Sequence, residues 1–280
     1  MIEAAPVDLE SLVEIELPPL PGSAMRVAAL TQDLNASARE IADAIGLDPI
    51  LAARILRAAN SPLYSFERRV TALPMAVSAV GNKNIHLLVV TSATADAFQK
   101  KGKRSASELI LWEHSVAVGL AAREIMFMLR LRGVEEGFLC GLLHDIGKLL
   151  LLRHDKEAYE QLIKESQESD LLAAERALFG YTHTQVGALA TKRWNLPEAI
   201  SHSIYHHHDP SKAHQSVLMA RVVDVADTLA NRAGLGLQPG PTGELSEMES
   251  VIALRLSEDQ LKEVWEKIQP SLSETFSLFS

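Results

Sequence analysis

The sequence predicts an all-α protein built from two packed helical subdomains. Apolar residues recur at helical spacing along most of the 280-residue chain, and the alternating pattern of a half-buried strand is scarce. Three helix starts carry N-capping signals, namely Ser37 with Glu40 three residues later, Asp48 followed directly by Pro49, and Ser257 with Gln260 three residues later. The charge is uneven, because residues 1–105 contain 11 basic and 11 acidic side chains while the rest carries the whole net charge of −9. This difference favours two subdomains.

Helices account for nearly all of the expected elements. In chain order they span residues 25–34, 37–45, 49–59, 73–80, 84–98, 108–131, 135–152, 156–166, 170–179, 184–194, 197–206, 216–232, 244–253 and 257–268. A break at Gly234–Gly243 separates the last two from the others. We divide the chain into a lead (1–16), a first helical subdomain (17–105), a second helical bundle (106–235) and a C-terminal helical extension (236–280).

Composition argues against several classes of function. No apolar run is long enough to span a membrane, and residues 1–21 lack the features of a secretory signal. The single cysteine, Cys140, cannot form an internal disulfide, so we expect a cytoplasmic protein. The net charge argues against general polyanion binding. The helix–Gly–helix pattern at 37–59, with Arg54 and Arg57, is compatible with a helix-turn-helix, but its neutral surroundings favour simple helix packing over DNA binding.

The most informative segment is Phe138–Leu152, which is apolar except for a polar cluster that contains His144, Asp145 and Lys148. A helix through this segment places His144 and Asp145 roughly 100° apart, with Lys148 one turn later. Burial of an unpaired carboxylate is costly, so Asp145 must be ion-paired, heavily hydrogen-bonded or bound to a metal. Because an imidazole and a carboxylate can converge here on one cation, the segment indicates a metal-dependent enzyme or a descendant of one.

Further candidate ligands come from separate expected helices, about 20 to 40 residues apart, as in bundles that assemble a central metal site. They are His114, His183, the triplet His206–His208, Asp224 and Asp227. Each also has a structural interpretation: an isolated histidine can be a core residue, and Asp224 can pair with Arg221, which leaves Asp227 facing inward. Histidine nitrogens with a few carboxylates suit iron, manganese, zinc or nickel better than calcium or magnesium.

The remaining histidines are expected to lie outside the site. They are His86, His154 next to Asp155, His202 and His214. His202 and His206 have the i, i+4 spacing that can bind a metal, and this remains a minor alternative.

Taken together, the motifs resemble the HDOD family, the regulatory branch of the HD phosphohydrolase superfamily. In the first half they are Leu17–Pro21, Asp48-Pro49, Arg54–Pro62 and the stretch from Val70 to Gly81. In the second half they are Trp112–Ser115, Gly141–Lys148, Phe179-Gly180 with His183, Gly187, Trp194–Pro197, Ile204, His207-His208 with Pro210, and Ala226-Asp227. The similarity covers roughly residues 17–230. It implies an all-helical fold whose second part is an HD-superfamily-like helical bundle.

The resemblance also implies a set of site residues. It places the metal ligands of the superfamily at His114, His144, Asp145, His183, His207, His208 and Asp227, and a phosphate-contacting lysine at Lys148. His206 falls outside the family register. One or two divalent transition-metal ions are therefore expected, with iron or manganese favoured and zinc or nickel as alternatives. If the chain is an enzyme, Asp145 and Lys148 are its expected catalytic residues.

For function, the resemblance implies a bacterial signal-transduction role exerted through contacts with other signalling proteins. The alternative is a metal-dependent phosphohydrolase that acts on nucleotides or cyclic dinucleotides. Relatives that cleave cyclic-di-GMP carry a Gly-Tyr-Pro motif after the histidine pair, where this chain has Asp209–Ser211, and some have a glutamate where this chain has Ile110. These departures favour the regulatory role and argue against a third metal. A nucleotide or phosphate is a further expected ligand.

Overall fold

The structure, a computed structural model, describes residues 8–17, 22–33, 35–60, 69–82, 84–86, 88–89, 92–93, 105–166, 170–194 and 196–279. The regular structure within these residues is helical and includes no strand, so the all-α prediction is confirmed. The chain divides into two compact units. The site unit, as we call it, consists of Met1–Pro18 and Gly102–Leu272, and the small unit of Pro19–Lys101 and Ser273–Ser280. No described helix is both long and apolar enough to cross a membrane.

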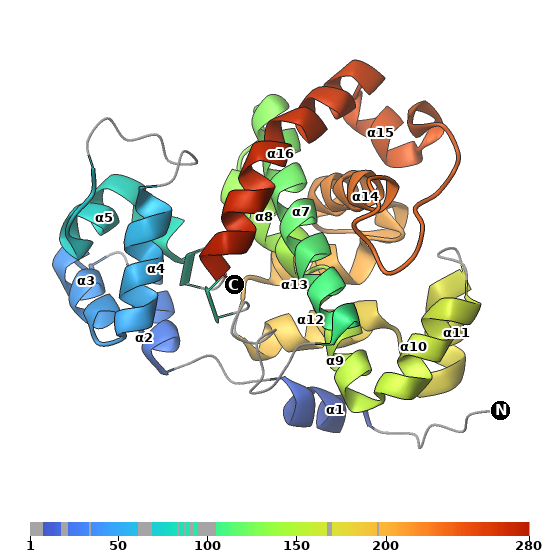
Figure 1. The fold of residues 1–280 in the computed structure, drawn as a ribbon, viewed down its shortest axis with the longest axis horizontal. Coiled ribbons are helices and arrows are strands. Elements are labelled where there is room, and N and C mark those ends of the chain that lie inside the picture. The colour runs from blue at the N-terminus through green and yellow to red at the C-terminus, as the bar shows by residue number, and fades with distance from the viewer. Residues whose placement is uncertain are drawn as a thin grey trace. The chain divides into compact units, whose positions relative to one another are not determined.

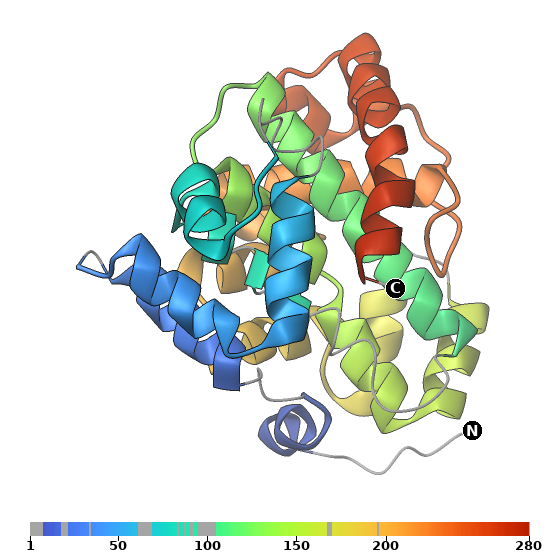
Figure 2. The same cartoon turned by 60° about the vertical axis from the view of Figure 1, so that its left-hand side comes forward.

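The site unit is a bundle organised around α7, which buries most of its residues. Its helices are α1 Leu9–Glu16, α7 Ala106–Met128, α8 Val134–Leu143, α9 Ile146–His154, α10 Lys156–Glu165, α11 Leu171–Phe179, α12 His183–Arg193, α13 Glu198–His206, α14 Val217–Arg232, α15 Glu249–Leu254 and α16 Glu258–Phe279, the last of which ends in the small unit. α7 packs along α8 and α14, and α12 packs against α9 and α13 (Figures 1 and 2). Several helices therefore converge on one interior.

The expected single helix over residues 135–152 is wrong, because the chain turns between α8 and α9 at His144 and Asp145. The glycines on either side explain the break. A Cβ on Gly141 would lie 2.7 Å from the carbonyl oxygen of Val118 in α7, and one on Gly147 would lie 2.0 Å from the carbonyl oxygen of His183 in α12. α8 and α9 thus contact the backbones of two different partner helices, and the turn lets each helix face its own partner.

The small unit contains its own apolar core. Its helices are α2 Gly22–Gln32, α3 Ala38–Gly46, α4 Pro49–Ala59 and α5 Leu73–Val80. α3 packs against α2, α4 and α5, with Ile41 and Ile45 fully buried. The capping box at Ser37 and the N-cap at Asp48 are both confirmed. Much of the expected helix 84–98 lies outside the described residues.

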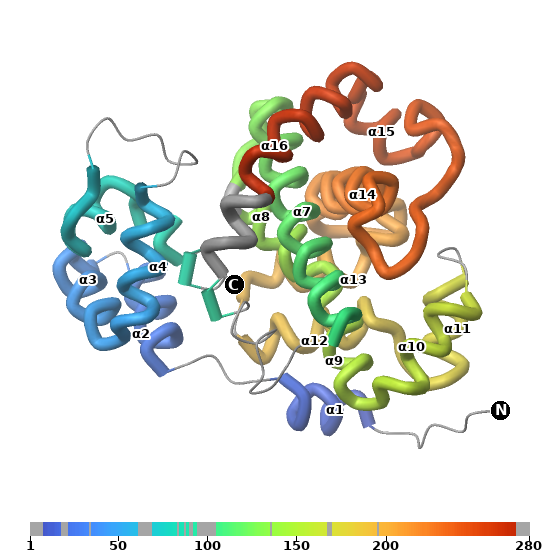
Figure 3. Tube along the Cα trace, viewed as in Figure 1, coloured from blue at the N-terminus to red at the C-terminus, as the bar shows by residue number. Residues whose placement is uncertain are grey.

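Both ends of the site unit differ from the sequence analysis. Helix α1, which packs on α9 and α12, lies within the segment that was treated as a lead. The expected helix 244–253 is instead a 3₁₀ turn at Leu245–Glu247 followed by α15. The last helix has the expected cap at Ser257 but continues to Phe279. The segment Ala233–Met248, which we call the strap, is the long connection between α14 and α15 (Figure 3).

Candidate metal centre

Five histidines and two aspartates from separate segments of the site unit converge in its interior. His208 is half-buried and the other six are buried. Their positions in the fold are His114 on α7, His144 and Asp145 at the α8–α9 turn, His183 at the start of α12, His207 and His208 directly after α13, and Asp227 on α14. These are the seven residues that the sequence analysis expected to be ligands, and the structure brings all of them together.

The seven side chains form two groups that Asp145 joins. The ligand atoms of Asp145, His183, His207 and His208 lie within 4.8 Å of one another, as do those of a second group, His114, His144 and Asp227. Asp145 Oδ1 lies 3.4 Å from His183 Nε2, whereas Oδ2 lies 3.3 Å from His144 Nε2. The two oxygens of one carboxylate therefore face two different sets of nitrogens, as a carboxylate that bridges two cations would.

The Nδ1 atoms of four of these histidines are held by acceptors outside the centre. The Nδ1–H groups donate to backbone carbonyls in three cases, His114 to Leu235, His144 to Gly141 and His207 to Ile204, and to the Glu175 carboxylate in the case of His183. This pattern fixes the tautomer and leaves each Nε2 lone pair directed into the centre.

The inward-facing atoms lack the partners that burial demands. His114 Nε2 and His144 Nε2 lie 3.2 Å apart, so their lone pairs need a proton or a cation between them. His207 Nε2 and both Asp145 oxygens are buried without a hydrogen-bond partner. The Asp145 oxygens instead lie among charged or potentially charged nitrogens, 2.7 Å from Lys148 Nζ and 3.3–3.9 Å from the Nε2 atoms of four histidines. Buried polar atoms are normally paired, so the donor set fits transition-metal ions.

The carboxylates of the centre are held in their ionised form. Burial opposes the ionisation of Asp145, but the charges of His144 and Lys148 outweigh it and keep the pKa of this carboxyl well below its usual range. Burial also opposes protonation of His144, yet Asp145 and Asp227 raise its pKa to about 10. The two carboxylates therefore favour a positive charge beside them. Either a proton on His144 or a bound metal cation can supply it.

The histidine pair after α13 is held neutral. Burial, reinforced by the neighbouring His208, lowers the pKa of His207 well below its usual range. Burial together with the nearby His183 lowers the pKa of His208 to about 3. A neutral imidazole is the form that binds a metal, so both residues are prepared as ligands.

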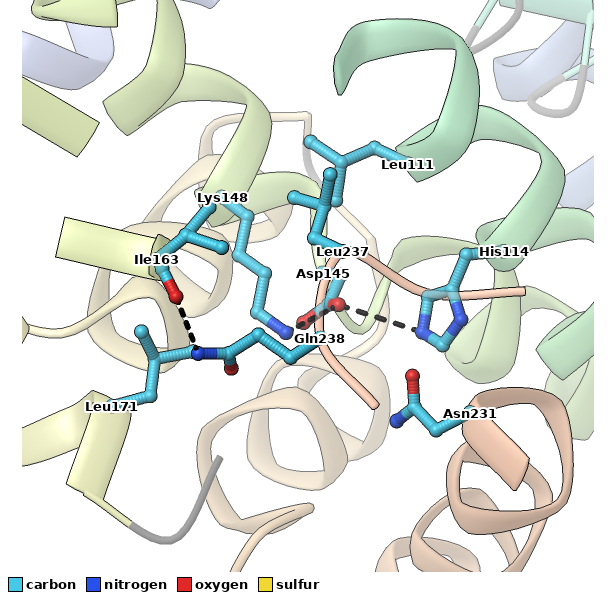
Figure 4. Close-up of a pocket in the computed structure, with 9 residues that line it drawn as sticks. All are labelled: Leu111, His114, Asp145, Lys148, Ile163, Leu171, Asn231, Leu237 and Gln238. Carbon is cyan, nitrogen blue, oxygen red and sulfur yellow. Dashed lines mark hydrogen bonds and ion pairs between the residues drawn. The ribbon is translucent and has the colours of Figure 1, made fainter. Parts of the chain in front are cut away.

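Lys148 lies beside the carboxylate that joins the two groups. Its Nζ is 2.7 Å from Asp145 Oδ2, and 13% of its side chain is exposed. In Figure 4 the ammonium points from α9 at the Asp145 carboxylate, with His114 on the opposite side. This position agrees with the expected contact of Lys148 with phosphate, which stays a prediction.

The strap covers the Lys148 side of the centre. Leu237 and Gln238 cross it, and the Gln238 amide donates to the carbonyl oxygens of Ile163 and Ser166 at the end of α10 (Figure 4). The cavity that remains beside Lys148 measures about 10 Å³, close to the minimum for one water molecule. A phosphate can reach Lys148 from this side only if the strap moves.

The sequence analysis missed Glu175, a fully buried residue of α11. Its carboxylate accepts hydrogen bonds from His183 Nδ1 at 2.8 Å, from the His183 backbone N–H at 2.8 Å and from Tyr159 Oη at 2.7 Å. Burial opposes its ionisation, but His183 outweighs this and lowers its pKa. A charged residue on the apolar face of α11, eight residues before His183, was the signal in the sequence.

The remaining candidates lie outside both groups. His86 contacts Thr31 in the small unit, His202 pairs with Glu198, and Asp155 caps α10. His206 is half-buried and His214 is exposed. Asp224 accepts a hydrogen bond from Ser250, while the Arg221 guanidinium pairs with Glu249. Arg54, considered for DNA binding, donates to the Ser92 hydroxyl at 2.8 Å.

Comparison with known proteins places the chain in a family. The HDOD domain matches residues 17–210, so the chain belongs to the HDOD family. It is 22% identical over 200 residues to an uncharacterised protein of Treponema pallidum (strain Nichols), a match that covers 69% of this chain and 38% of that protein. The chain thus spans well under half the length of this curated relative.

Solved structures share the fold over nearly the whole chain. An HDOD domain protein of unknown function from Geobacter sulfurreducens is 26% identical, with a TM-score of 0.73 and coverage of 97% of this chain and 98% of that chain. A "putative phosphohydrolase" from Shewanella amazonensis SB2B is 23% identical, with a TM-score of 0.77 and the same coverage. A "putative signal transduction protein" from Marinobacter aquaeolei VT8 is 23% identical, with a TM-score of 0.71 and coverage of 99% of this chain and 62% of that chain. The last two support the fold alone.

Proposed function

We propose that this chain is a metal-dependent phosphohydrolase whose centre holds two divalent transition-metal ions, with iron or manganese preferred. The observation that supports this most directly is the position of Asp145, whose two buried oxygens face two separate groups of histidines. A carboxylate in this position is suited to a two-metal site, and two-metal sites are typical of enzymes that hydrolyse phosphate esters.

The residues of the centre have distinct tasks in this proposal. One ion would be held by His114, His144 and Asp227 and the other by His183, His207 and His208, with Asp145 available to both groups. The bound ions supply Lewis acidity and lower the pKa of a water toward neutrality. Lys148 holds a phosphoryl oxygen through a charge-assisted hydrogen bond. Burial of the centre excludes bulk water and so strengthens these interactions.

A second cavity, between α14 and residues 241–248 of the strap, offers a ligand another route to the centre. It measures about 370 Å³ and contains His208 and Asp227 in its wall, one ligand from each group. A phosphate ester can therefore approach both proposed ions from this side without displacing Leu237 and Gln238, the strap residues that cover Lys148.

Elemental analysis and turnover test the proposal. Protein purified without chelator is expected to contain up to two transition-metal ions per chain, and manganese- or iron-loaded protein to hydrolyse a phosphomonoester or phosphodiester in a screen that includes cyclic dinucleotides. Asp145→Asn should lower the metal affinity and the turnover by more than about 100-fold, since even outer residues of metal sites contribute 10- to 100-fold. His202→Asn, which changes a histidine outside the centre, should leave both unchanged. Absence of any turnover that depends on Asp145 would end the enzymatic proposal.

The second candidate function is the regulatory role, in which the metal centre is a structural or ligand-sensing element and the output is contact with a signalling protein. The observation that favours it is the closed strap, which leaves about 10 Å³ beside Lys148. In this case the metal content is expected without turnover, and binding of a partner purified from the native cell should change when the ions are removed. If Asp145→Asn and the wild-type protein bind the partner equally well, the metal centre does not act as a ligand-sensing element.

A further inference from the structure

We infer that the cavity between α14 and the strap binds the organic part of the substrate, and that this substrate is the monophosphate ester of a hydroxylated alcohol of nucleoside size. The inference deepens the proposed function and rests on it. His208 and Asp227 lie in the wall of this cavity, which we call the α14 cavity. A phosphate bound at the proposed ions therefore directs its ester substituent into the α14 cavity.

The volume of the α14 cavity limits the size of that substituent. At about 370 Å³ it lies near the lower end of small-molecule pockets, which measure about 300–1,000 Å³. One nucleoside or one sugar fits such a space. A cyclic dinucleotide, which contains two nucleosides and two phosphates, would extend beyond it.

The wall of the α14 cavity combines polar and apolar residues. Asp224, Thr228 and Arg232 lie at successive turns on one face of α14, and apolar side chains are contributed by Leu172, Leu245 and Met248. Carboxylates and hydroxyls can bind the hydroxyl groups of a ribose, as acidic residues do in dinucleotide-binding folds. The apolar side chains can cover a base, and a guanidinium can stack on it. The combination suits a polyol joined to an apolar ring system.

The charges in the wall disfavour a second phosphate. Asp224 and Glu244 place two carboxyl groups in it, and Arg232 is the cationic residue among those that the structure describes there. The Arg232 guanidinium already donates to the Gly243 carbonyl oxygen of the strap. A second phosphate would therefore be repelled by Asp224 and Glu244. Arg232 could offset this only in part, because its guanidinium already donates a hydrogen bond to the strap. This arrangement selects monophosphates over diphosphates and triphosphates.

Calorimetric binding to the full-length, manganese-loaded protein tests the inference. The ligands are inorganic phosphate, glucose 6-phosphate, the non-hydrolysable phosphonate analogue of AMP, and α,β-methylene-ADP. The AMP analogue should bind at least about tenfold more tightly than inorganic phosphate, a gain of about 1.4 kcal/mol, and more tightly than α,β-methylene-ADP. If glucose 6-phosphate binds more tightly than the AMP analogue, the assignment to a nucleoside-sized alcohol is wrong.

Variants in the wall locate the binding. Thr228→Phe fills the α14 cavity and should remove the advantage of the AMP analogue over inorganic phosphate. Leu218→Phe adds the same bulk at a 47% exposed position of α14 outside the cavity and should change neither affinity. At pH 8, above the raised pKa of Asp224 of about 7, Asp224→Asn keeps the shape of the side chain but removes its charge, so it should reduce the preference for the AMP analogue over α,β-methylene-ADP by about tenfold.

The outcomes separate this inference from the proposed function. If inorganic phosphate binds but Thr228→Phe and Leu218→Phe bind the AMP analogue equally well, the inference is wrong and the phosphohydrolase proposal stands. If the metal-loaded protein does not bind inorganic phosphate, both are wrong.

Discussion

The side chain of Glu175 shows how a single residue outside the metal centre prepares a ligand inside it. The carboxylate accepts from both the backbone N–H and the Nδ1–H of His183, so the ring is fixed in position and in tautomer. Tyr159 donates to the same carboxylate and holds it in place. The Nε2 atom of His183 is thereby directed into the centre, toward Asp145 and His208.

We expect Glu175→Gln to lower the affinity for the bound metal by about 10- to 100-fold, the usual cost of losing such a partner. The amide can accept one hydrogen bond through its oxygen, but its NH₂ group opposes a second donor. Chelator competition followed by elemental analysis measures the affinity. Tyr159→Phe is the matched control, because it removes one hydrogen bond and keeps the carboxylate. Equal metal affinities in the two variants would show that Glu175 does not position His183.

Asp224 links the stability of the fold to pH. Burial raises its pKa from 3.8 to about 7, and the hydrogen bond from Ser250 opposes this rise. Because the folded-state pKa lies above the unfolded value, the folded state binds more protons between about pH 4 and 7. The contribution to stability is therefore complete below about pH 4 and is lost as the pH rises through 7.

Asp224→Asn abolishes this titration. The free energy of unfolding of the variant, minus that of the wild type, is expected to increase steadily between pH 4 and pH 7 in chelator-treated protein, as measured by urea unfolding. A difference that stays constant across this range would contradict the assigned pKa.

At the scale of the helices, the position of the centre depends on the turn between α8 and α9. Gly147 allows α9 to contact the α12 backbone, since a Cβ there would lie 2.0 Å from the His183 carbonyl oxygen. Gly147→Ala must therefore push α9 away from α12 and displace His183. We expect a loss of about 1–3 kcal/mol in unfolding free energy, typical of overpacking, together with weaker metal binding. Gly243→Ala is the control, because a Cβ there meets no atom within 4 Å. Equal stability of the two variants would show that the close contact is not needed.

Most of the helices could be predicted because their signals are local. Apolar spacing located α7, α12 and α14, and the capping residues at Ser37 and Asp48 marked two helix starts. The turn after α8 could not be predicted in this way, because residues 138–152 are apolar apart from the cluster with His144, Asp145 and Lys148 and contain no proline, and Asp145, the N-cap of α9, makes no side-chain cap hydrogen bond. Its cause is the contact of Gly141 and Gly147 with two helices that lie elsewhere in the sequence.

The same distinction applies to the candidate site. The seven expected ligands could be named from motifs, and the structure brings them together, while their role as ligands stays a prediction. Glu175 and the strap were missed, since their importance lies in contacts with distant residues. The hydrogen bond from His114 Nδ1 to the Leu235 carbonyl oxygen joins residues 121 positions apart in the sequence, so no local sequence pattern predicts it.

At the scale of the whole molecule, the proposed metal ligands all belong to the site unit, and the small unit has a separate core. A ligand that binds the folded state stabilises it by about 2.7 kcal/mol when its free concentration is 100 times its dissociation constant. Metal ions should therefore stabilise the site unit through the segments that carry their ligands. The small unit should gain nothing directly, because none of the seven candidate ligands lies in it.

Hydrogen exchange on the full chain, with and without chelator, tests this prediction. Removal of the ions is expected to speed exchange in α7, α9, α12 and α14, whose residues hold or adjoin the ligands, and to leave α3 and α4 unchanged. The same comparison in Asp145→Asn is the control, since that variant should exchange like the chelated protein under both conditions. Uniform acceleration across α3, α4 and the helices of the site unit would mean that the ions stabilise the chain as one cooperative body. No acceleration anywhere in the wild type would argue that the seven side chains fold together without a metal.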